Sequence, residues 1–204
     1  KTSGELKTKP TQHSVKELRE IGIQPNILLC RTAQPLTKQI REKIGLFCNV
    51  NPDAVIQAID VSCIYEVPIL FHQEGLDNLI IQHLDLKCGE LKMDDWIKMM
   101  EKIKNPKHKV KIGICGKYTH LKDAYKSIIE AFIHAGVEND ARVELKWINA
   151  EEVNPQTASK IFEDVDGVLI PGGFGERGIE GKIEAIRYVR ENKIPYLGIC
   201  LGMQ

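Results

Sequence analysis

Two patterns of apolar residues alternate along this chain: one has the period of a helix, and the other is typical of a buried strand. Ser14 and Glu17 have the spacing of a capping box, which predicts a helix that starts there and ends at Gly22. The pattern then predicts a strand at 27–30, a helix with Ile40, Ile44 and Phe47 on one face, a strand at 54–59 and a short helix at 76–83. Residues 1–84 are therefore predicted to form an α/β layer with a parallel sheet.

The alternation starts again at residue 110. Strands are predicted at 110–115, 142–148 and 168–170, and helices at 121–135, 154–162 and 179–192, with Gly136 capping the first of these helices. A last apolar run, from Pro195 to Ile199, predicts a buried strand. The short connections predict a second open, doubly wound, mostly parallel sheet, with its site at the carboxyl ends of the strands.

Residues 85–109 interrupt this alternation. An apolar stripe formed by Trp96, Met99, Met100 and Ile103 predicts a helix, and Asn105-Pro106 predicts its end. We therefore predict a first α/β domain at 1–84, an interdomain linker with a short helix at 85–109, and a second α/β domain at 110–204.

The charge balance excludes several classes of function. Basic and acidic side chains number 28 each, so no net charge draws the chain to nucleic acid or to a membrane surface. No apolar stretch approaches the ~18 residues of a membrane span, and there is no secretory signal. The six cysteines lack zinc-type spacing, which predicts reduced thiols and a cytoplasmic protein. Because the chain begins at Lys1 and stops just after Cys200, we expect it to be part of a longer polypeptide.

The stretch from Gly198 to Gly202, with Cys200 at its centre, carries the strongest chemical signal. A G-x-C-x-G after a strand is the thiol form of the nucleophile elbow, a tight strand-to-helix turn that exposes the nucleophile above a sheet. Glycines flank the cysteine because such a turn is crowded, and the positive end of a helix favours the thiolate. The alternative is that Cys200 is a buried structural cysteine.

A glycine-rich loop at 172–178 follows the strand at 168–170. Its two consecutive glycines expose backbone N–H groups, which suits an oxyanion hole for a tetrahedral acyl intermediate. Because this loop lies one helix before the cysteine motif in the same predicted sheet, the two together indicate an acyl-transfer site.

A second candidate site lies at the start of the chain. Lys7, Thr8, Lys9 and Thr11 precede the predicted helix start, and cationic and hydroxyl side chains beside a helix N-terminus suit a phosphate group. The alternative is a solvated loop without a ligand.

Together these motifs resemble a known family. Pro171-Gly-Gly-Phe-Gly175 followed by Gly198-Ile-Cys-Leu-Gly-Met-Gln204 is similar to the class I glutamine amidotransferase domain. Further segments resemble the CTP synthase family over essentially the whole chain: Lys7-Thr-Lys-Pro-Thr-Gln-His-Ser14, Phe47-Cys-Asn49, Gly116-Lys-Tyr118 and Asp123-Ala-Tyr-Lys-Ser127. The resemblance implies an incomplete Rossmann-like amidoligase part and an incomplete flavodoxin-like glutaminase part.

For the second domain, the resemblance implies glutamine hydrolysis. Cys200 would be the nucleophile that forms a glutamyl thioester, in a triad whose His and Glu would follow Gln204. Glutamine binding and the oxyanion contacts would come from Gly173, Leu201, Gly202, Met203 and Gln204. No histidine of this chain lies in a matching motif, so the isolated chain is predicted to be inactive.

For the first domain, the resemblance implies ATP- and Mg²⁺-dependent amination of UTP to CTP by ammonia channelled from the glutaminase. The UTP and CTP contacts would be Lys7, Thr8, Lys9, Pro10, Thr11, Gln12 and Lys43. Ile59, Asp60 and Val61 fall where the family contacts ATP, although Ile59 often corresponds to a polar or basic residue. No metal ligand is assigned, because the family's ATP loop and Mg²⁺-binding acids would precede Lys1.

The resemblance also implies partners. CTP would be a feedback inhibitor and GTP an activator of glutamine hydrolysis, and the protein would form homotetramers and filaments. Two alternatives remain: the glutaminase subunit of another class I amidotransferase, which leaves residues 1–109 without a role, and a non-catalytic binding module.

Overall fold

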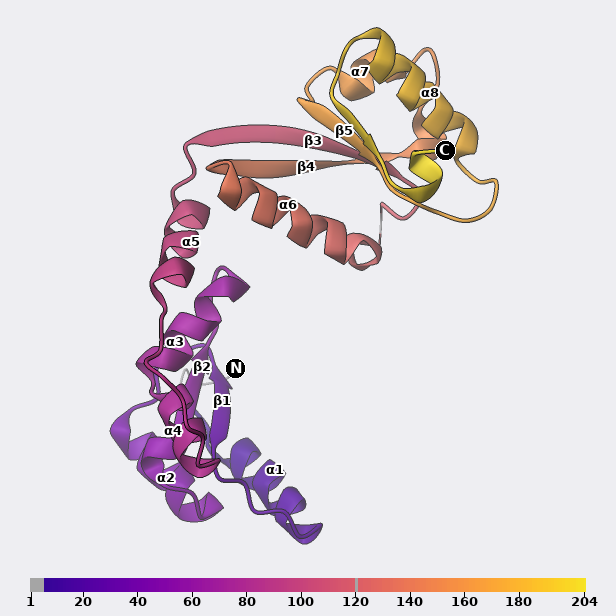
Figure 1. Cartoon of the computed structure of the whole chain (residues 1–204). Helices are drawn as coiled ribbons and strands as arrows, with labels where there is room; N and C mark the ends of the chain where they lie inside the picture. The colour runs from indigo at the N-terminus through magenta and orange to yellow at the C-terminus, as the bar shows by residue number, and fades with distance from the viewer. Residues whose placement is uncertain (1–5, 120) are drawn as a thin grey trace. The chain divides into compact units, whose positions relative to one another are not determined.

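Every strand in the described part of the computed structural model, residues 6–119 and 121–204, pairs in parallel with its neighbours. The chain divides into two compact units, Lys1–Met100 and Glu101–Gln204. The boundary lies within helix α5 (Asp94–Lys104) (Figure 1). The parallel sheets confirm the predicted α/β class, while the domain limits drawn from the sequence stay a prediction.

Unit 1 is built on a parallel pair of strands, β1 (Leu28–Thr32) and β2 (Val55–Ile59), in register from Leu28 opposite Val55 to Thr32 opposite Ile59. Its helices are α1 (Lys9–Glu20), α2 (Lys38–Cys48), α3 (Val67–Gln73) and α4 (Leu76–His83), followed by the start of α5. Short 3₁₀ turns, η1 (Pro52–Ala54) and η2 (Ile64–Glu66), precede β2 and α3. Buried Val15, Ile44 and Cys48 pack with β1 and β2 in one core.

Helix α1 begins earlier than its sequence pattern indicates. Thr8 is its N-cap residue and Pro10 lies in its first turn, whereas Ser14 lies inside the helix and donates from Oγ to the Pro10 carbonyl at 3.1 Å. The predicted capping box at Ser14 and Glu17 was therefore wrong. A proline in the first turn has no N–H to leave unpaired and already has the helical φ, so it sets the helix start here.

The buried face of α2 also differs from the prediction. Ile44 is buried as expected, but Phe47 is 59% exposed and Cys48 is fully buried in its place. Because Ile40, Ile44 and Cys48 are spaced by four residues, they form one stripe toward the strands, and Phe47 projects beside it.

An ion-pair cluster joins α2 to β2. The Arg41 guanidinium donates to a Glu74 carboxylate oxygen at 2.7 Å and to the Val55 carbonyl at 2.8 Å, and Gln57 donates to the other Glu74 oxygen at 2.9 Å. Burial opposes ionisation of Glu74, but the hydrogen bonds from Arg41 and Gln57 outweigh it and lower the pKa of this carboxyl. The cluster thus fixes the segment between α3 and α4 against the sheet.

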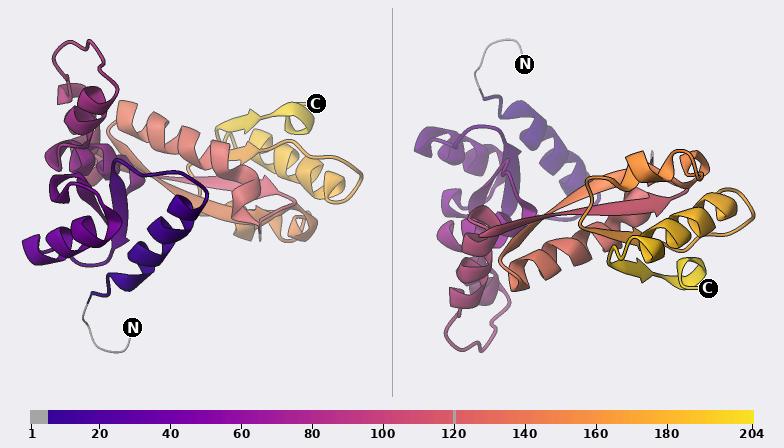
Figure 2. Two further views of the ribbon diagram at one scale, coloured as in Figure 1. Left: turned by 90° about the horizontal axis from the view of Figure 1, so that it is seen from below. Right: turned by 90° about the horizontal axis from the view of Figure 1, so that it is seen from above.

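Unit 2 has a four-stranded parallel sheet in the order β4-β3-β5-β6. Its strands are β3 (His108–Gly116), β4 (Ala141–Asn149), β5 (Gly167–Ile170) and β6 (Tyr196–Gly198). Its helices are α6 (Lys126–Glu138), α7 (Ala158–Phe162) and α8 (Ile179–Glu191), with 3₁₀ turns η3 (Lys122–Tyr125), η4 (Ala150–Glu152) and η5 (Cys200–Gly202). Helix α6 covers one face of the sheet, and α7 and α8 pack together on the other (Figures 1 and 2). This is the predicted doubly wound, flavodoxin-like arrangement.

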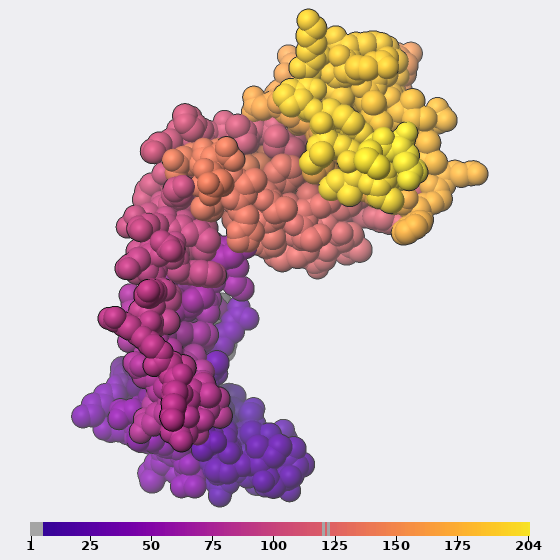
Figure 3. All heavy atoms as spheres, in the orientation of Figure 1, coloured from indigo at the N-terminus to yellow at the C-terminus, as the bar shows by residue number. Residues whose placement is uncertain are grey.

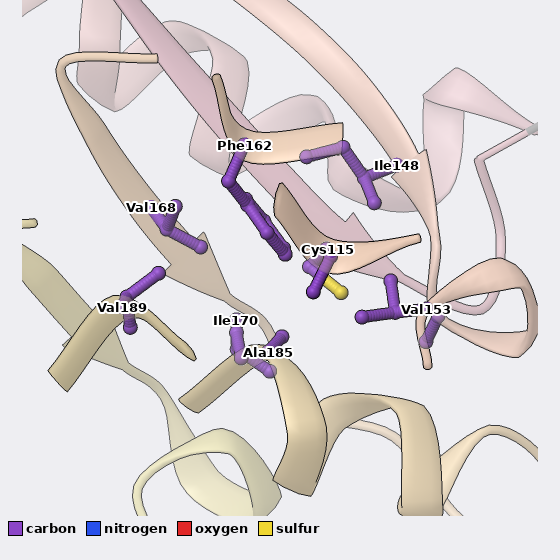
Figure 4. Close-up of a cluster of buried hydrophobic side chains, with 10 residues drawn as sticks. Cys115, Ile148, Val153, Phe162, Val168, Ile170, Ala185 and Val189 are labelled. Carbon is purple, nitrogen blue, oxygen red and sulfur yellow. The ribbon is translucent and has the colours of Figure 1, made fainter. Parts of the chain in front are cut away.

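The core of unit 2 lies between the sheet and the α7–α8 face. Phe162 is 1% exposed and lies among Ile148, Val168 and Cys115, with Ala185 and Val189 of α8 closing the cluster (Figure 4). The Phe162 ring also stacks on Tyr188 at a centroid distance of 5.7 Å. Loops at the end of this sheet are therefore held by a well-packed layer.

Two sequence expectations fail in unit 2. Gly136 does not end α6, which continues to Glu138; a Cβ at this buried glycine would overlap the Ala141 carbonyl, so close packing against β4 explains it. The strand near the C-terminus is not buried, because β6 lies at the sheet edge and Leu197 is 59% exposed. The space-filling view likewise shows the yellow C-terminal residues on the surface of unit 2 (Figure 3).

The burial of Phe162 gives a stability prediction. Phe162→Ala should lower the free energy of unfolding of unit 2 by ~3–5 kcal/mol, because it removes buried apolar area and leaves a cavity. Phe174→Ala is the matched control, since Phe174 is 91% exposed, and it should change this free energy by less than ~0.5 kcal/mol. Urea unfolding followed by Trp147 fluorescence in a Trp96→Phe background measures both variants, and equal midpoints would contradict the assigned core.

Candidate functional site

Cys200 occupies a strained turn directly after β6. Its φ is +53°, in the left-handed region that non-glycine residues rarely adopt. The residue before it, Ile199, is extended, and the 3₁₀ turn η5 begins at Cys200 itself. The Cys200 side chain is exposed, so the turn presents a thiol at the carboxyl end of the sheet. This geometry is that of a nucleophile elbow.

The flanking glycines are required by close backbone approach. A Cβ at Gly198 would overlap the carbonyl of Gly202, and a Cβ at Gly202 would overlap the carbonyl of Ile170. Two hydrogen bonds close the turn: the Ile199 N–H donates to the Ile170 carbonyl at 3.0 Å, and the Tyr196 hydroxyl donates to the Gly202 carbonyl. The turn is therefore fixed to the ends of both β5 and β6.

The glycine-rich loop after β5 lies against Cys200. A Cβ built on Gly172 would be 3.2 Å from the Cys200 Cβ and 3.7 Å from its Sγ. Within residues 6–119 and 121–204, the backbone N–H groups of Gly173 and Leu201 donate to no backbone carbonyl. These two donors can therefore be aimed at an oxyanion beside the thiol.

The other predicted glutamine contacts are arranged differently. The N–H of Gly202 donates to the Ile199 carbonyl at 2.9 Å, and those of Met203 and Gln204 donate to the Cys200 carbonyl at 3.0 and 3.2 Å. Their backbone donors are thus used inside the turn. Gly202 is buried, whereas the side chains of Met203 and Gln204 are exposed and can reach a ligand.

Two buried lysines lie behind the loop, and the sequence patterns assigned neither of them a role, although Lys117 lies in the Gly116-Lys-Tyr118 segment. Lys117 is 5% exposed and donates to the carbonyls of Phe174 and Gly175 at 2.7 and 2.6 Å. Lys182 is 3% exposed and donates to the Pro171 carbonyl at 3.0 Å. A signal existed for Lys182, which lies between Gly181 and Ala185 on the buried stripe of α8, where a lysine is out of place.

Cys115, at the end of β3, is a second thiol close to this region but is not a second nucleophile. It is fully buried, and desolvation raises its pKa to about 12 despite the opposing charge of Lys182. A thiol in this state carries almost no thiolate at neutral pH, so Cys115 belongs to the core.

Three histidines have defined places in the described ranges. His13 Nδ1 lies 3.3 Å from a Glu17 carboxylate oxygen and His72 Nδ1 lies 2.7 Å from an Asp77 carboxylate oxygen, both in unit 1. His108 starts β3, at the opposite end of that strand from the site. His120 lies outside the described residues. The absence of a base for Cys200 from this chain stays a prediction.

The lysine-rich segment of unit 1 leads into α1: Lys7 precedes the helix, Thr8 is its N-cap and Lys9 begins its first turn. Lys7 and Lys9 are exposed, while Thr8 is buried and its Oγ1 accepts from the Gln12 amide at 3.1 Å. Thr11 is half-buried in the same turn. Val15 and Cys30 share one core, which places α1 beside β1. Pro10 is exposed in the same turn, and Lys43 is exposed on α2, the helix against which α1 packs.

The three residues that resemble an ATP contact lie at the carboxyl end of β2. Asp60 is exposed; its N–H donates to the Thr32 carbonyl at 3.2 Å and its carboxylate accepts from Arg31 at 3.0 Å. Ile59 and Val61 are half-buried. The pairing of Asp60 with Arg31 leaves a cation and an anion at the same sheet edge.

Two structural features are absent from the described residues. No group of three or more His, Cys, Asp or Glu side chains there has the arrangement needed to hold a metal ion. Nor does any helix in those ranges have both the length and the apolar character needed to cross a membrane.

Comparison with protein families identifies both units. Residues 1–86 match the family described as "CTP synthase N-terminus", and residues 120–204 match "Glutamine amidotransferase class-I". The curated CTP synthase of Clostridium beijerinckii is 57% identical over 202 residues, which is 99% of this chain and 38% of that protein. The chain belongs to the CTP synthase family.

Other relatives of the CTP synthase family agree with this assignment. The CTP synthase of Carboxydothermus hydrogenoformans is 56% identical over 204 residues, 100% of this chain and 38% of its own length. The chain thus spans 38% of the length of these curated relatives. A solved structure, "Trypanosoma brucei CTPS - glutaminase domain with bound acivicin", is 38% identical with a TM-score of 0.44, covering 47% of this chain and 38% of that one.

The crowding at Gly202 predicts a selective effect on the elbow. Gly202→Ala should lower the free energy of unfolding of unit 2 by at least ~1 kcal/mol, because its Cβ would displace the Ile170 carbonyl from the turn. Gly89→Ala is the control, since its Cβ would meet no atom within 4 Å. Urea midpoints measure stability, and the alkylation rate of Cys200 reports the turn. If Gly202→Ala matches Gly89→Ala in both measurements, the close packing of this turn is contradicted.

Proposed function

We propose that this chain is part of a glutamine-dependent CTP synthase, which aminates UTP with ammonia released from glutamine and uses ATP. The observation that carries the proposal is the elbow at Cys200 beside the N–H groups of Gly173 and Leu201, which donate to no backbone carbonyl of the described residues, in a chain whose residues 1–86 match the CTP synthase N-terminus. A free-standing glutaminase subunit would leave that match unexplained, so the two-site enzyme is favoured.

In the glutaminase reaction, the Cys200 thiolate attacks the carboxamide carbon of glutamine. The carbonyl oxygen becomes an oxyanion, to which the N–H groups of Gly173 and Leu201 donate. The carbon–nitrogen bond then breaks, the nitrogen leaves as ammonia after protonation, and a thioester forms on Cys200. Water hydrolyses this thioester to glutamate. The groups that transfer protons are proposed to lie outside this chain.

Binding of glutamine itself is assigned to the exposed side chains after the elbow. Met203 and Gln204 follow the nucleophile, and their N–H groups already close the turn, so their side chains are the parts that remain for contact. Gly202 is proposed to act by permitting the turn rather than by touching glutamine, because it is buried under the Ile170 carbonyl.

In the synthetase reaction, the first turn of α1 is proposed to bind the UTP substrate and the CTP inhibitor. Lys7 and Lys9 supply exposed cations, and the turn from Thr8 to Gln12 supplies polar side chains at a helix N-terminus. Lys43 on the adjacent α2 is proposed as a further phosphate contact.

The ATP and metal requirements belong to the whole enzyme. The described residues contain no group of three or more His, Cys, Asp or Glu side chains arranged to hold a metal ion. The acids that bind Mg²⁺ are proposed to lie outside this chain. Ile59, Asp60 and Val61 remain a proposed ATP contact at the edge of β2. Activation by GTP, inhibition by CTP, homotetramers, filaments and a cytoplasmic location are proposed from family membership.

The role of Cys200 is tested in the full-length protein with ATP, UTP, Mg²⁺ and either glutamine or ammonia. Cys200→Ala should abolish CTP formation from glutamine and leave formation from ammonia near the wild-type rate, because ammonia bypasses the thioester. Cys88→Ala is the control, since Cys88 is another exposed cysteine, and it should behave like wild type with both donors. Glutamine-dependent synthesis by Cys200→Ala would contradict the nucleophile role, and no synthesis by wild type would contradict the whole proposal.

The UTP site is tested with ammonia as donor, so that the glutaminase plays no part. Lys7→Ala should raise KM for UTP about tenfold or more, because a charge-assisted phosphate contact is lost. Lys16→Ala removes an exposed lysine further along α1 that pairs with Glu20, and it should leave KM unchanged. Equal KM values in the two variants would remove Lys7 from the site.

A further inference from the structure

Lys117 and Lys182 are buried cations with no carboxylate partner in the described chain. Other lysines of unit 2 pair with acids at its surface, such as Lys109 with Glu144 and Lys111 with Asp164, both at 2.8 Å. Removing an ammonium group from water costs several kcal/mol unless an opposite charge compensates it. A buried lysine satisfied only by carbonyl groups therefore calls for a specific role.

Lys182 is bonded to the point where the glycine-rich loop leaves the sheet. Its ammonium donates to the Pro171 carbonyl at 3.0 Å, one residue after the Ile170 carbonyl that accepts from Ile199. A Cβ built on the next residue, Gly172, would lie 3.2 Å from the Cys200 Cβ, and a Cβ built on Gly173 would lie 3.6 Å from the Lys182 Nζ. The ammonium thus lies under the stretch that carries one proposed oxyanion donor.

Lys182 also interacts electrostatically with the nucleophile. Three titratable groups face it: Lys117, Cys115 and Cys200. Burial, followed by the like charge of Lys117, lowers the pKa of Lys182, while the thiolate forms of Cys115 and Cys200 oppose this shift.

Charges on the other elements packed against α8 do not neutralise Lys182. On η4, a Glu151 carboxylate oxygen lies 3.5 Å from an Arg177 guanidinium nitrogen, and a Glu152 carboxylate oxygen accepts from the Asn149 side-chain amide at 3.2 Å. On α7, Lys160 is exposed. The ammonium is therefore available to the loop.

We propose that Lys182 is a positioning residue of the glutaminase site, which holds the glycine-rich loop against Cys200 through its hydrogen bond to the Pro171 carbonyl. The inference deepens the proposed function and rests on it for the reaction, but the effect of the loop on access to the thiol is independent of the substrate. Lysine suits this role because its four-carbon stem packs in the core of unit 2 while the ammonium reaches the Pro171 carbonyl.

The test uses the full-length protein and three variants: Lys182→Met, which keeps the stem without the charge, Lys182→Arg, which keeps a charge, and Arg190→Met, which removes an exposed cation from the same helix. The rate of Cys200 alkylation by iodoacetamide at a fixed pH, followed by mass spectrometry of its peptide, should rise in Lys182→Met, because a loosened loop covers the thiol less. At the same pH, kcat/KM for glutamine should fall about threefold or more, while ammonia-dependent CTP formation is retained. Arg190→Met should match wild type throughout, and Lys182→Arg should restore the alkylation rate.

The alkylation rate decides the outcome. An unchanged rate in Lys182→Met overturns the proposal, whatever happens to stability or turnover. If Lys182→Met also loses ammonia-dependent synthesis, the arginine variant decides instead: a wild-type rate supports the proposal, and a raised one overturns it. A wild type that cannot use glutamine contradicts the proposed function alone, because the change in alkylation rate remains measurable.

Discussion

The left-handed backbone at Cys200 is the constraint on which the site depends. A non-glycine residue at a φ of +53° costs free energy, and the surrounding contacts must hold it there. They do so from both sides. The Ile199 N–H donates to the Ile170 carbonyl at the end of β5, and the Tyr196 hydroxyl donates to the Gly202 carbonyl. A Cβ at Gly198 or Gly202 would overlap a backbone carbonyl, so only glycine fits at these two positions. An exposed thiol results because the turn directs the side chain away from the sheet.

Strand order determines what this thiol meets. In the order β4-β3-β5-β6, the loops after β3, β5 and β6 all lie at the carboxyl edge of the sheet. The loop after β3 carries Lys117, the loop after β5 carries Gly172 and Gly173, and the turn after β6 carries Cys200. Since Lys117 donates to the carbonyls of Phe174 and Gly175, and Lys182 of α8 to that of Pro171, the loop after β5 is held from two sides by cations.

The sequence predicted the local features of this site better than those that depend on tertiary packing. Cys200 and its glycines form a contiguous motif, so the elbow could be read from five residues. Lys182 could not be assigned in this way, because only the packed structure shows that its ammonium is buried and reaches Pro171. The start of α1 was missed for another reason: Ser14 and Pro10 are competing start signals, and the proline prevailed. Phe47 was misplaced because Cys48 continues the buried stripe of α2 equally well.

The site also explains why unit 2 needs a dense core next to it. A strained turn at Cys200 and two buried lysines without carboxylate partners in the described chain each disfavour the folded state. Close by, Phe162, Ile170, Ala185 and Val189 are almost completely buried on the α7–α8 face of the sheet. Lys182 is on the same helix as Ala185 and Val189, so the apolar contacts that fix α8 also fix the ammonium. Burial of apolar area there offsets the electrostatic cost, and it keeps the loop and the thiol at a constant separation.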